Sequence, residues 1–180
     1  VAECASAGFN LTDLHTAGFS VNVCKTAGYS LAACLRAGFL SSACKKAGFT
    51  AEQYRQEGMT AFDLREAGFS AADCRSVGYS ISDCKKGGYN VAECQAGGFS
   101  PADCKRAGFT LADFKSVGLS AAHCKEAGFT ARDCRGAGFL AADLREAGFS
   151  AAQCHAAGFP RAACLTAGYT EAECEKAGMR

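Results

Sequence analysis

Residues 70–80, Ser-Ala-Ala-Asp-Cys-Arg-Ser-Val-Gly-Tyr-Ser, contain one complete copy of the pattern that decides the fold. The pattern has ten places, counted so that Ala71 is at place one and Ser80 at place ten. It fills the whole chain of 180 residues, and glycine occupies place eight of every block from Gly8 to Gly178. A short fixed period indicates a small structural unit copied end to end, whatever the chain length. The sequence therefore predicts a tandem decapeptide-repeat solenoid, a single continuous array over residues 1–180.

Each block carries the start and stop signals of a short α-helix. Ser70 is a good N-cap, and Asp73 stands where a capping box places its reciprocal acid. Gly78 suits the left-handed residue that ends many helices, and an apolar residue follows it as in a Schellman motif. Pro101 stands at the first helical position, where proline is tolerated. We therefore expect an all-α solenoid of eighteen short helices, each of seven or eight residues.

Helices of this length are not stable alone, so their stability must come from stacking. We expect places one, four, seven and nine to form the inner face, and places three, five and six to face water. Place three is acidic and place five is Lys or Arg in 11 blocks each, which suggests two charge ladders on the outside. If Gly78 is left-handed, Gly78→Ala is expected to destabilise the fold by about 1 kcal/mol or more.

A second interpretation cuts the chain into units of five. Residues 142–146 (Ala-Asp-Leu-Arg-Glu) and residues 147–151 (Ala-Gly-Phe-Ser-Ala) resemble the pentapeptide-repeat family, whose motif is Ala, then Asp or Asn, then Leu or Phe, then two variable residues. The resemblance implies a right-handed β-helix and a binding protein. It does not account for glycine in every second unit, and it would turn apolar residues such as Leu11 toward water. The β-helix remains the alternative to the helical solenoid.

All the cysteines occupy place four, where Leu, Tyr or Phe stand in the remaining blocks. A position that accepts either Cys or Leu is typical of a buried apolar slot. The Cys-x-x-Cys spacing of zinc sites does not occur, and an odd number of thiols cannot all pair. We predict reduced core thiols, with a disulfide ladder or a column of soft metal ions such as Cu(I) as alternatives. The residues are Cys4, Cys24, Cys34, Cys44, Cys74, Cys84, Cys94, Cys104, Cys124, Cys134, Cys154, Cys164 and Cys174.

Several classes of function are disfavoured by charge and composition. A net charge of +1 supplies no basic field for nucleic acid, and no apolar run approaches the length of about 20 residues that spans a membrane. His15, His123 and His155 lie at polar places without paired spacing, so we expect surface residues rather than metal ligands. The glycine spacing matches no phosphate-binding loop. We therefore predict no enzyme, no catalytic residues and no cofactor.

Blocks that depart from the pattern are the better candidates for function. Residues 51–60 combine Tyr54, Glu57 and Met59, and three blocks lack a capping side chain. Gly87 and Gly97 replace Ala and suggest a looser pair of helices. The residues in place of the cap are Leu40, Leu140 and Pro160.

The resulting prediction is a non-catalytic structural or protein-binding scaffold. Its partner would be another protein or copies of itself end to end, because the terminal blocks keep repeat-like inner faces and only the last block is somewhat more charged. A ladder of Ser and Thr side chains at place ten could also bind ice or a mineral surface. This function is not expected if the place-ten hydroxyls cap helices, because they are then engaged in hydrogen bonds. Free cysteines would favour a reducing, intracellular compartment.

Overall fold

A computed structural model describes residues 10–180, and within that range it contains seventeen α-helices and no strand. The expected all-α solenoid is confirmed, and the β-helix is wrong for this part of the chain. The helix expected in the first block lies outside the described residues, as does Cys4. The helices are α2 (Leu11–Thr16), α3 (Val21–Thr26), α4 (Leu31–Arg36), α5 (Ser41–Lys46), α6 (Ala51–Gln56), α7 (Ala61–Glu66), α8 (Ala71–Ser76), α9 (Ile81–Lys86), α10 (Val91–Ala96), α11 (Pro101–Arg106), α12 (Leu111–Ser116), α13 (Ala121–Glu126), α14 (Ala131–Gly136), α15 (Ala141–Glu146), α16 (Ala151–Ala156), α17 (Arg161–Thr166) and α18 (Glu171–Lys176).

Every described helix has six residues, one or two fewer than expected. The helix stops at place six because place seven already forms the C-cap, with ψ of 11° at Val77. Gly78 then turns the chain at φ +86°, and all seventeen place-eight glycines in the described range have positive φ. The expected left-handed glycine is confirmed.

The backbone groups at both helix ends are satisfied within the repeat. At the start of α8, the Ser70 hydroxyl accepts from the Asp73 N–H at 3.1 Å, and Asp73 Oδ2 accepts from the Ser70 N–H at 2.8 Å. At its end, the Gly78 N–H donates to the Arg75 carbonyl at 2.9 Å, and the Tyr79 N–H donates to the Cys74 carbonyl at 3.0 Å. These are the capping box and the Schellman motif that the sequence predicts.

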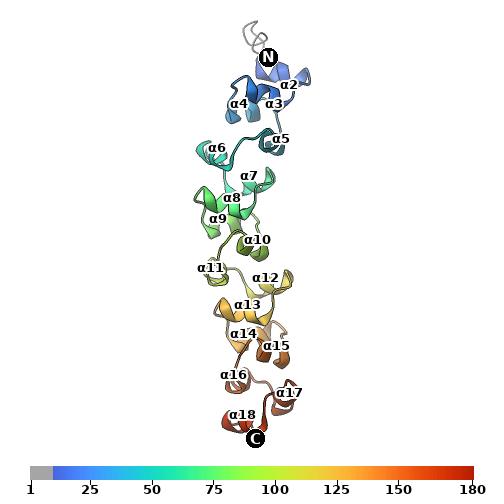
Figure 1. Ribbon diagram of the computed structural model, residues 1–180, viewed down its shortest axis with the longest axis vertical. Coiled ribbons are helices and arrows are strands. Elements are labelled where there is room, and N and C mark those ends of the chain that lie inside the picture. Colours follow the sequence, from blue (N-terminus) through green and yellow to red (C-terminus); the bar gives the residue numbers. More distant parts are fainter. Residues whose placement is uncertain (1–9) are drawn as a thin grey trace. The chain divides into compact units, whose positions relative to one another are not determined.

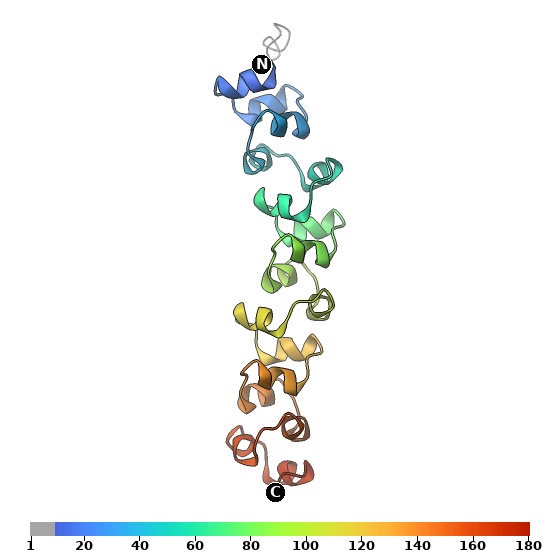
Figure 2. The ribbon, with the colours of Figure 1, turned by 180° about the vertical axis from the view of Figure 1, so that it is seen from behind.

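The chain divides into two compact units, residues 1–89 and 90–180. The first unit is described from residue 10 and holds α2–α9, and the second holds α10–α18. In each unit, helices contact both the next helix and the next but one, as α7 does with α8 and α9, and α13 with α14 and α15. Figures 1 and 2 show from opposite sides that, within each unit, the helices follow one another in chain order.

Place four forms the centre of each unit. The twelve described cysteines are 0% exposed, and Tyr54, Leu64, Phe114 and Leu144 share that burial at the same place. The predicted apolar slot is confirmed. Places one and nine complete the core, as Val91 and Phe49 illustrate.

Gly87 does not loosen its helix. A β-carbon at Gly87 would lie 2.8 Å from the carbonyl carbon of Ala61 and from the backbone nitrogen of Phe62. Real β-carbons do not approach backbone atoms so closely, so glycine lets the end of α9 pack directly against the start of α7. Our interpretation of Gly87 as a loose point was therefore wrong.

Candidate functional site

The basic side chains of place five do not simply face water. The Lys25 ammonium lies 5.1 Å from the centre of the Phe49 ring and donates to the Ala47 carbonyl at 3.0 Å. Arg135 repeats the arrangement, with its guanidinium carbon 5.3 Å from the Phe159 ring and a 2.7 Å hydrogen bond to the Ala157 carbonyl. Each cation thus covers an aromatic ring 24 residues later and caps the C-terminal end of the helix two repeats on, where the helix dipole favours positive charge.

The sequence carries this pairing through the whole chain. All eleven Lys and Arg residues at place five stand 24 residues before a Phe or Tyr at place nine. The three place-nine residues that are not aromatic each follow a place-five residue that is neither Lys nor Arg. Those pairs are Leu35–Met59, Gln95–Leu119 and His155–Met179. From Lys25 onward, cation and ring change together, which agrees with the attraction of a cation to the π face of a ring and not to an aliphatic chain.

The acidic side chains of place three accept hydrogen bonds from the N-cap residue of their own repeat. Hydrogen bonds from the hydroxyl and backbone N–H of Ser80 hold the pKa of Asp83 below its ordinary value. Thr130 lowers the pKa of Asp133 in the same way, with its backbone N–H as the larger cause. The acids at place three therefore complete the N-caps of their helices, and they also lie within electrostatic range of place-five cations, as Asp83 does of Arg55.

Two of the three histidines have structural contacts that the sequence analysis missed. The His15 ring lies 4.4 Å from that of Phe39 in an edge arrangement, at the spacing of 24 used by the cations. His123 Nδ1 lies 2.8 Å from the Ser120 hydroxyl, in the position of the capping-box acid. His15 and His155 are exposed, as expected, and His123 is partly exposed. The alignment of the ten-residue blocks could have predicted these contacts, because His15 stands at place five, where most blocks have a cation, and His123 stands at place three, where most have an acid.

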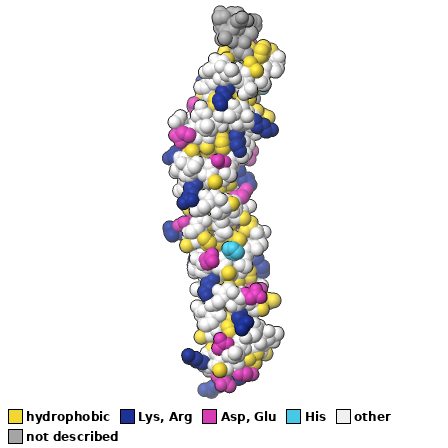
Figure 3. Space-filling view, viewed as in Figure 1, with side chains coloured by type: hydrophobic (Ala, Val, Ile, Leu, Met, Phe, Trp, Pro, Cys, Tyr) yellow, Lys and Arg dark blue, Asp and Glu magenta, His cyan; other side chains and the backbone are white. Residues whose placement is uncertain are grey.

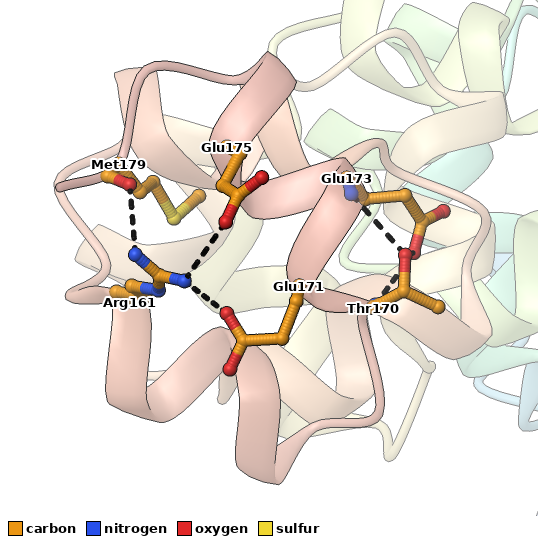
Figure 4. Close-up of polar contacts among 6 residues, drawn as sticks. All are labelled: Arg161, Thr170, Glu171, Glu173, Glu175 and Met179. Carbon is orange, nitrogen blue, oxygen red and sulfur yellow. Dashed lines mark hydrogen bonds and ion pairs between the residues drawn. The ribbon is translucent and has the colours of Figure 1, made fainter.

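Place one changes character at the end of the second unit. Arg161 and Glu171 stand where other blocks are mostly apolar, and they form an ion pair (Figure 4). Arg161 also lies 3.7 Å from Glu175 and donates to the Met179 carbonyl at 3.5 Å. These contacts cover α17 and α18 with charge rather than with an apolar surface.

In the first unit, the Cys74 thiol has hydrogen-bonding neighbours in the core. Cys74 is hydrogen bonded to the thiol of Cys84 and, at 3.3 Å, to the hydroxyl of Tyr89. The bond from Cys84 is the largest cause that lowers the pKa of Cys74. In the second unit, burial raises the pKa of Cys124 and of Cys134.

An apolar pocket lies between the start of α7 and the end of α9 in the first unit. Its volume is about 370 Å³, and its lining includes Met59, Phe62, Tyr79 and Gly87. Phe62 is 53% exposed and is the one aromatic residue that the sequence places at place two. Three departures from the repeat pattern, at places nine, two and seven, thus meet at one surface.

The model of the decapeptide repeat region matches residues 1–61, 48–121 and 108–180, which together cover the whole chain. The chain belongs to the decapeptide repeat family. Comparison with curated proteins and with solved structures gave no match.

This decapeptide repeat protein presents a mixed surface. Lys and Arg are interspersed with Asp and Glu on the visible face of both units (Figure 3). Within residues 10–180, no helix has the length and apolarity needed to cross a membrane. Over the same range no three His, Cys, Asp or Glu side chains gather as a metal site.

Proposed function

We propose that this decapeptide repeat protein is a non-catalytic scaffold that binds another protein through the pocket of its first unit. The observation that carries the proposal is the meeting of Met59, Phe62 and Gly87, each a departure from the repeat pattern, at one apolar surface. A repeat that served packing alone has no reason to expose an aromatic side chain there. Contiguous exposed apolar surface on a folded protein is typical of a binding site.

The rim of the pocket supports a protein partner. Asp83 and Lys86 lie beside the apolar lining. Protein interfaces combine an apolar centre with a polar rim, which matches this arrangement. The partner would insert a Leu, Met or aromatic side chain against Phe62 and place polar groups of both signs around it.

The contacts between alternate repeats supply the rigidity that a scaffold needs. A cation such as Lys25 ties its own helix to the turn two repeats later through a ring and a carbonyl. At the pocket, the Tyr79 hydroxyl donates to the Met59 carbonyl, and the Arg55 guanidinium carbon lies 5.5 Å from the centre of the Tyr79 ring. Preformed sites avoid the entropy cost of ordering on binding.

Copies of the same chain are the competing partner, and one observation favours a different protein. A contact between copies through α17 and α18 would meet the ion pair of Arg161 and Glu171 rather than an apolar face. Burying such a pair carries a desolvation cost. We therefore place the binding surface on the side of the array, at Phe62.

Affinity capture with three baits tests the proposal. The baits are the unaltered chain, Phe62→Ala, which restores the common residue of place two, and Leu140→Ser, which removes another exposed apolar side chain from the second unit. We expect one partner to be retained by the first and third baits and lost from the second. Equal capture by all three, or capture of the chain alone, would exclude the proposed site. Sedimentation of the three proteins measures self-association directly.

A further inference from the structure

We propose that a groove along α14 and α16, which pack against each other in the second unit (Figure 1), binds an acidic segment of a partner protein. Two hollows make up the groove, with volumes of about 560 Å³ and about 450 Å³. They adjoin, because Arg132, Ala156 and Ala157 line both. Lys125 lines the first hollow and Arg135 the second. Among the described residues no Asp or Glu lines either hollow, so the charge of the groove is positive.

Two guanidinium groups are fixed beside each other in this groove. Arg132 and Arg135 stand three residues apart in the sequence of α14, so they share one face of the helix. Arg132 Nη2 donates to the Ala156 carbonyl at 2.9 Å, and Arg135 Nη1 donates to the Ala157 carbonyl at 2.7 Å. The two cations are neighbours because these carbonyls are consecutive. A guanidinium has several N–H donors, so each group keeps donors for the oxygens of a carboxylate.

These two cations form no ion pair with an acid in the described part of the chain. The ion pairs found there belong to Arg106 and Arg161. Asp133, the acid of the same helix, accepts from the hydroxyl and the N–H of Thr130. Like charges held beside each other repel, and a bound carboxylate relieves that repulsion. The groove therefore presents a fixed positive charge that an acidic ligand complements.

The sequence of α14 departs from the repeat pattern where the helix borders the groove. Arg132 is the one basic residue at place two of the chain, and Gly136 is the one glycine at place six. Both line the second hollow. A β-carbon at Gly136 would meet no atom within 4 Å, so the packing of the helix does not require glycine, which weakens a helix relative to alanine. Glycine at this position instead leaves the space beside the two cations open.

The lining favours a peptide over a nucleic acid as the ligand. Phe129 and Phe149 line the first hollow together with Lys125, so an apolar side chain fits next to the cations. Thr130 and Gln153 add neutral hydrogen-bonding groups. A net charge of +1 does not supply the broad positive field on which nucleic-acid binding depends. The ligand is therefore a segment in which Asp or Glu residues flank an apolar residue.

Fluorescence anisotropy with a labelled peptide tests the proposal. The probe is Glu-Glu-Phe-Glu-Glu, and the same peptide with Gln in place of Glu is its uncharged control. Arg132→Ala restores the common residue of place two. Arg106→Ala is the matched control, because it changes the net charge equally and removes an exposed cation from outside the groove.

A second pair of variants separates charge from folding. Gly136→Glu places a carboxylate beside the two cations, whereas Gly136→Gln fills the same space without charge. Both are compatible with the fold, since Gln56 and Glu66 already occupy place six and the space at Gly136 is open. Circular dichroism confirms the folding of every variant.

We expect the acidic peptide to bind the unaltered chain, Arg106→Ala and Gly136→Gln with similar affinity, and the uncharged peptide to bind none of them. Arg132→Ala and Gly136→Glu should each weaken binding about tenfold or more, the effect of losing a hydrogen bond to a charged group. Phe62→Ala, in the first-unit pocket, should bind the peptide as the unaltered chain does, because the two sites are independent.

Several results would overturn the proposal. They are an absence of binding to the unaltered chain, equal losses in Arg132→Ala and Arg106→Ala, and equal losses in the two Gly136 variants. Displacement of the peptide by a single-stranded oligonucleotide that binds more tightly would replace the protein partner with a nucleic acid.

Discussion

Lys25 and Phe49, 24 residues apart, form a contact that joins alternate repeats: the ammonium nitrogen lies 5.1 Å from the ring centre. The same nitrogen donates to the Ala47 carbonyl and would lie only 2.8 Å from a β-carbon at Gly48. One side chain therefore covers a core ring, caps a helix and fills the space left by the left-handed glycine. A six-residue helix makes few internal hydrogen bonds, so such contacts between repeats hold much of the array together.

Lys25→Met should weaken the array through loss of this contact. Methionine keeps an apolar stem of similar reach but removes the cation and the donor. We expect the variant to lose about 1 kcal/mol, the combined size of an exposed cation–π contact and a modest hydrogen bond. Urea unfolding followed by circular dichroism measures the change. Lys46→Met is the matched control, because Lys46 is an exposed residue at place six of α5. The urea midpoint of this variant should equal that of the unaltered chain.

The local structure could be predicted from a single block, and the packing could not. Ser70, Asp73 and Gly78 act within one repeat, so their chemistry is visible in ten residues. The partner of Lys25 lies two repeats away, and only the stacking of helices reveals that spacing of 24. The residue types at place five and at place nine two repeats later vary together in the sequence. This covariation could have predicted the contact, but only if place five is compared with the correct later repeat.

The candidate site was predicted in part for the same reason. Residues 51–60 stood out by composition, and Met59 does line the pocket. Phe62 and Gly87 join it only because α9 packs against the start of α7, a contact over more than 20 residues. A departure from the repeat pattern identifies a position in the sequence. The packing of the helices determines which of these positions lie close together in the structure.

Gly87→Ala should destabilise the first unit although Ala is the common residue at place seven. A β-carbon there would meet the backbone of Ala61 and Phe62 at 2.8 Å, and backbone atoms cannot move aside cheaply. Overpacking of this kind costs about 1–3 kcal/mol. Thermal unfolding measures the loss. Gly136→Ala is the control, because a β-carbon at that helical position meets no atom within 4 Å, and it should raise stability. Equal behaviour of the two variants would contradict the close approach of α9 to α7.

Asp83 should make stability depend on pH in the acid range. Its pKa lies below the ordinary 3.8 because the Ser80 hydroxyl and N–H hydrogen bond to the carboxylate in the folded state. The carboxylate therefore stabilises the fold above about pH 4, and this contribution disappears as the pH falls through the lower, folded-state pKa. Asp83→Asn should reduce the difference in unfolding midpoint between pH 7 and pH 3. NMR titration of the Asp83 carboxyl carbon measures the pKa directly, and a value at or above 3.8 would contradict the mechanism.

Leu140→Ser should stabilise the second unit by completing a capping box. Leu140 is 67% exposed and supplies no side-chain bond to its helix, α15. Asp143 already accepts from the Leu140 N–H at 2.6 Å, so half of the box is present. A serine hydroxyl would accept from the Asp143 N–H, as Ser70 does for Asp73. Relative to Leu140→Ala, which removes the same exposed side chain without adding a cap, the gain should be about 1 kcal/mol. Thermal unfolding of the two variants measures it. Identical midpoints would mean that α15 gains nothing from a cap, which the geometry of the other repeats does not allow.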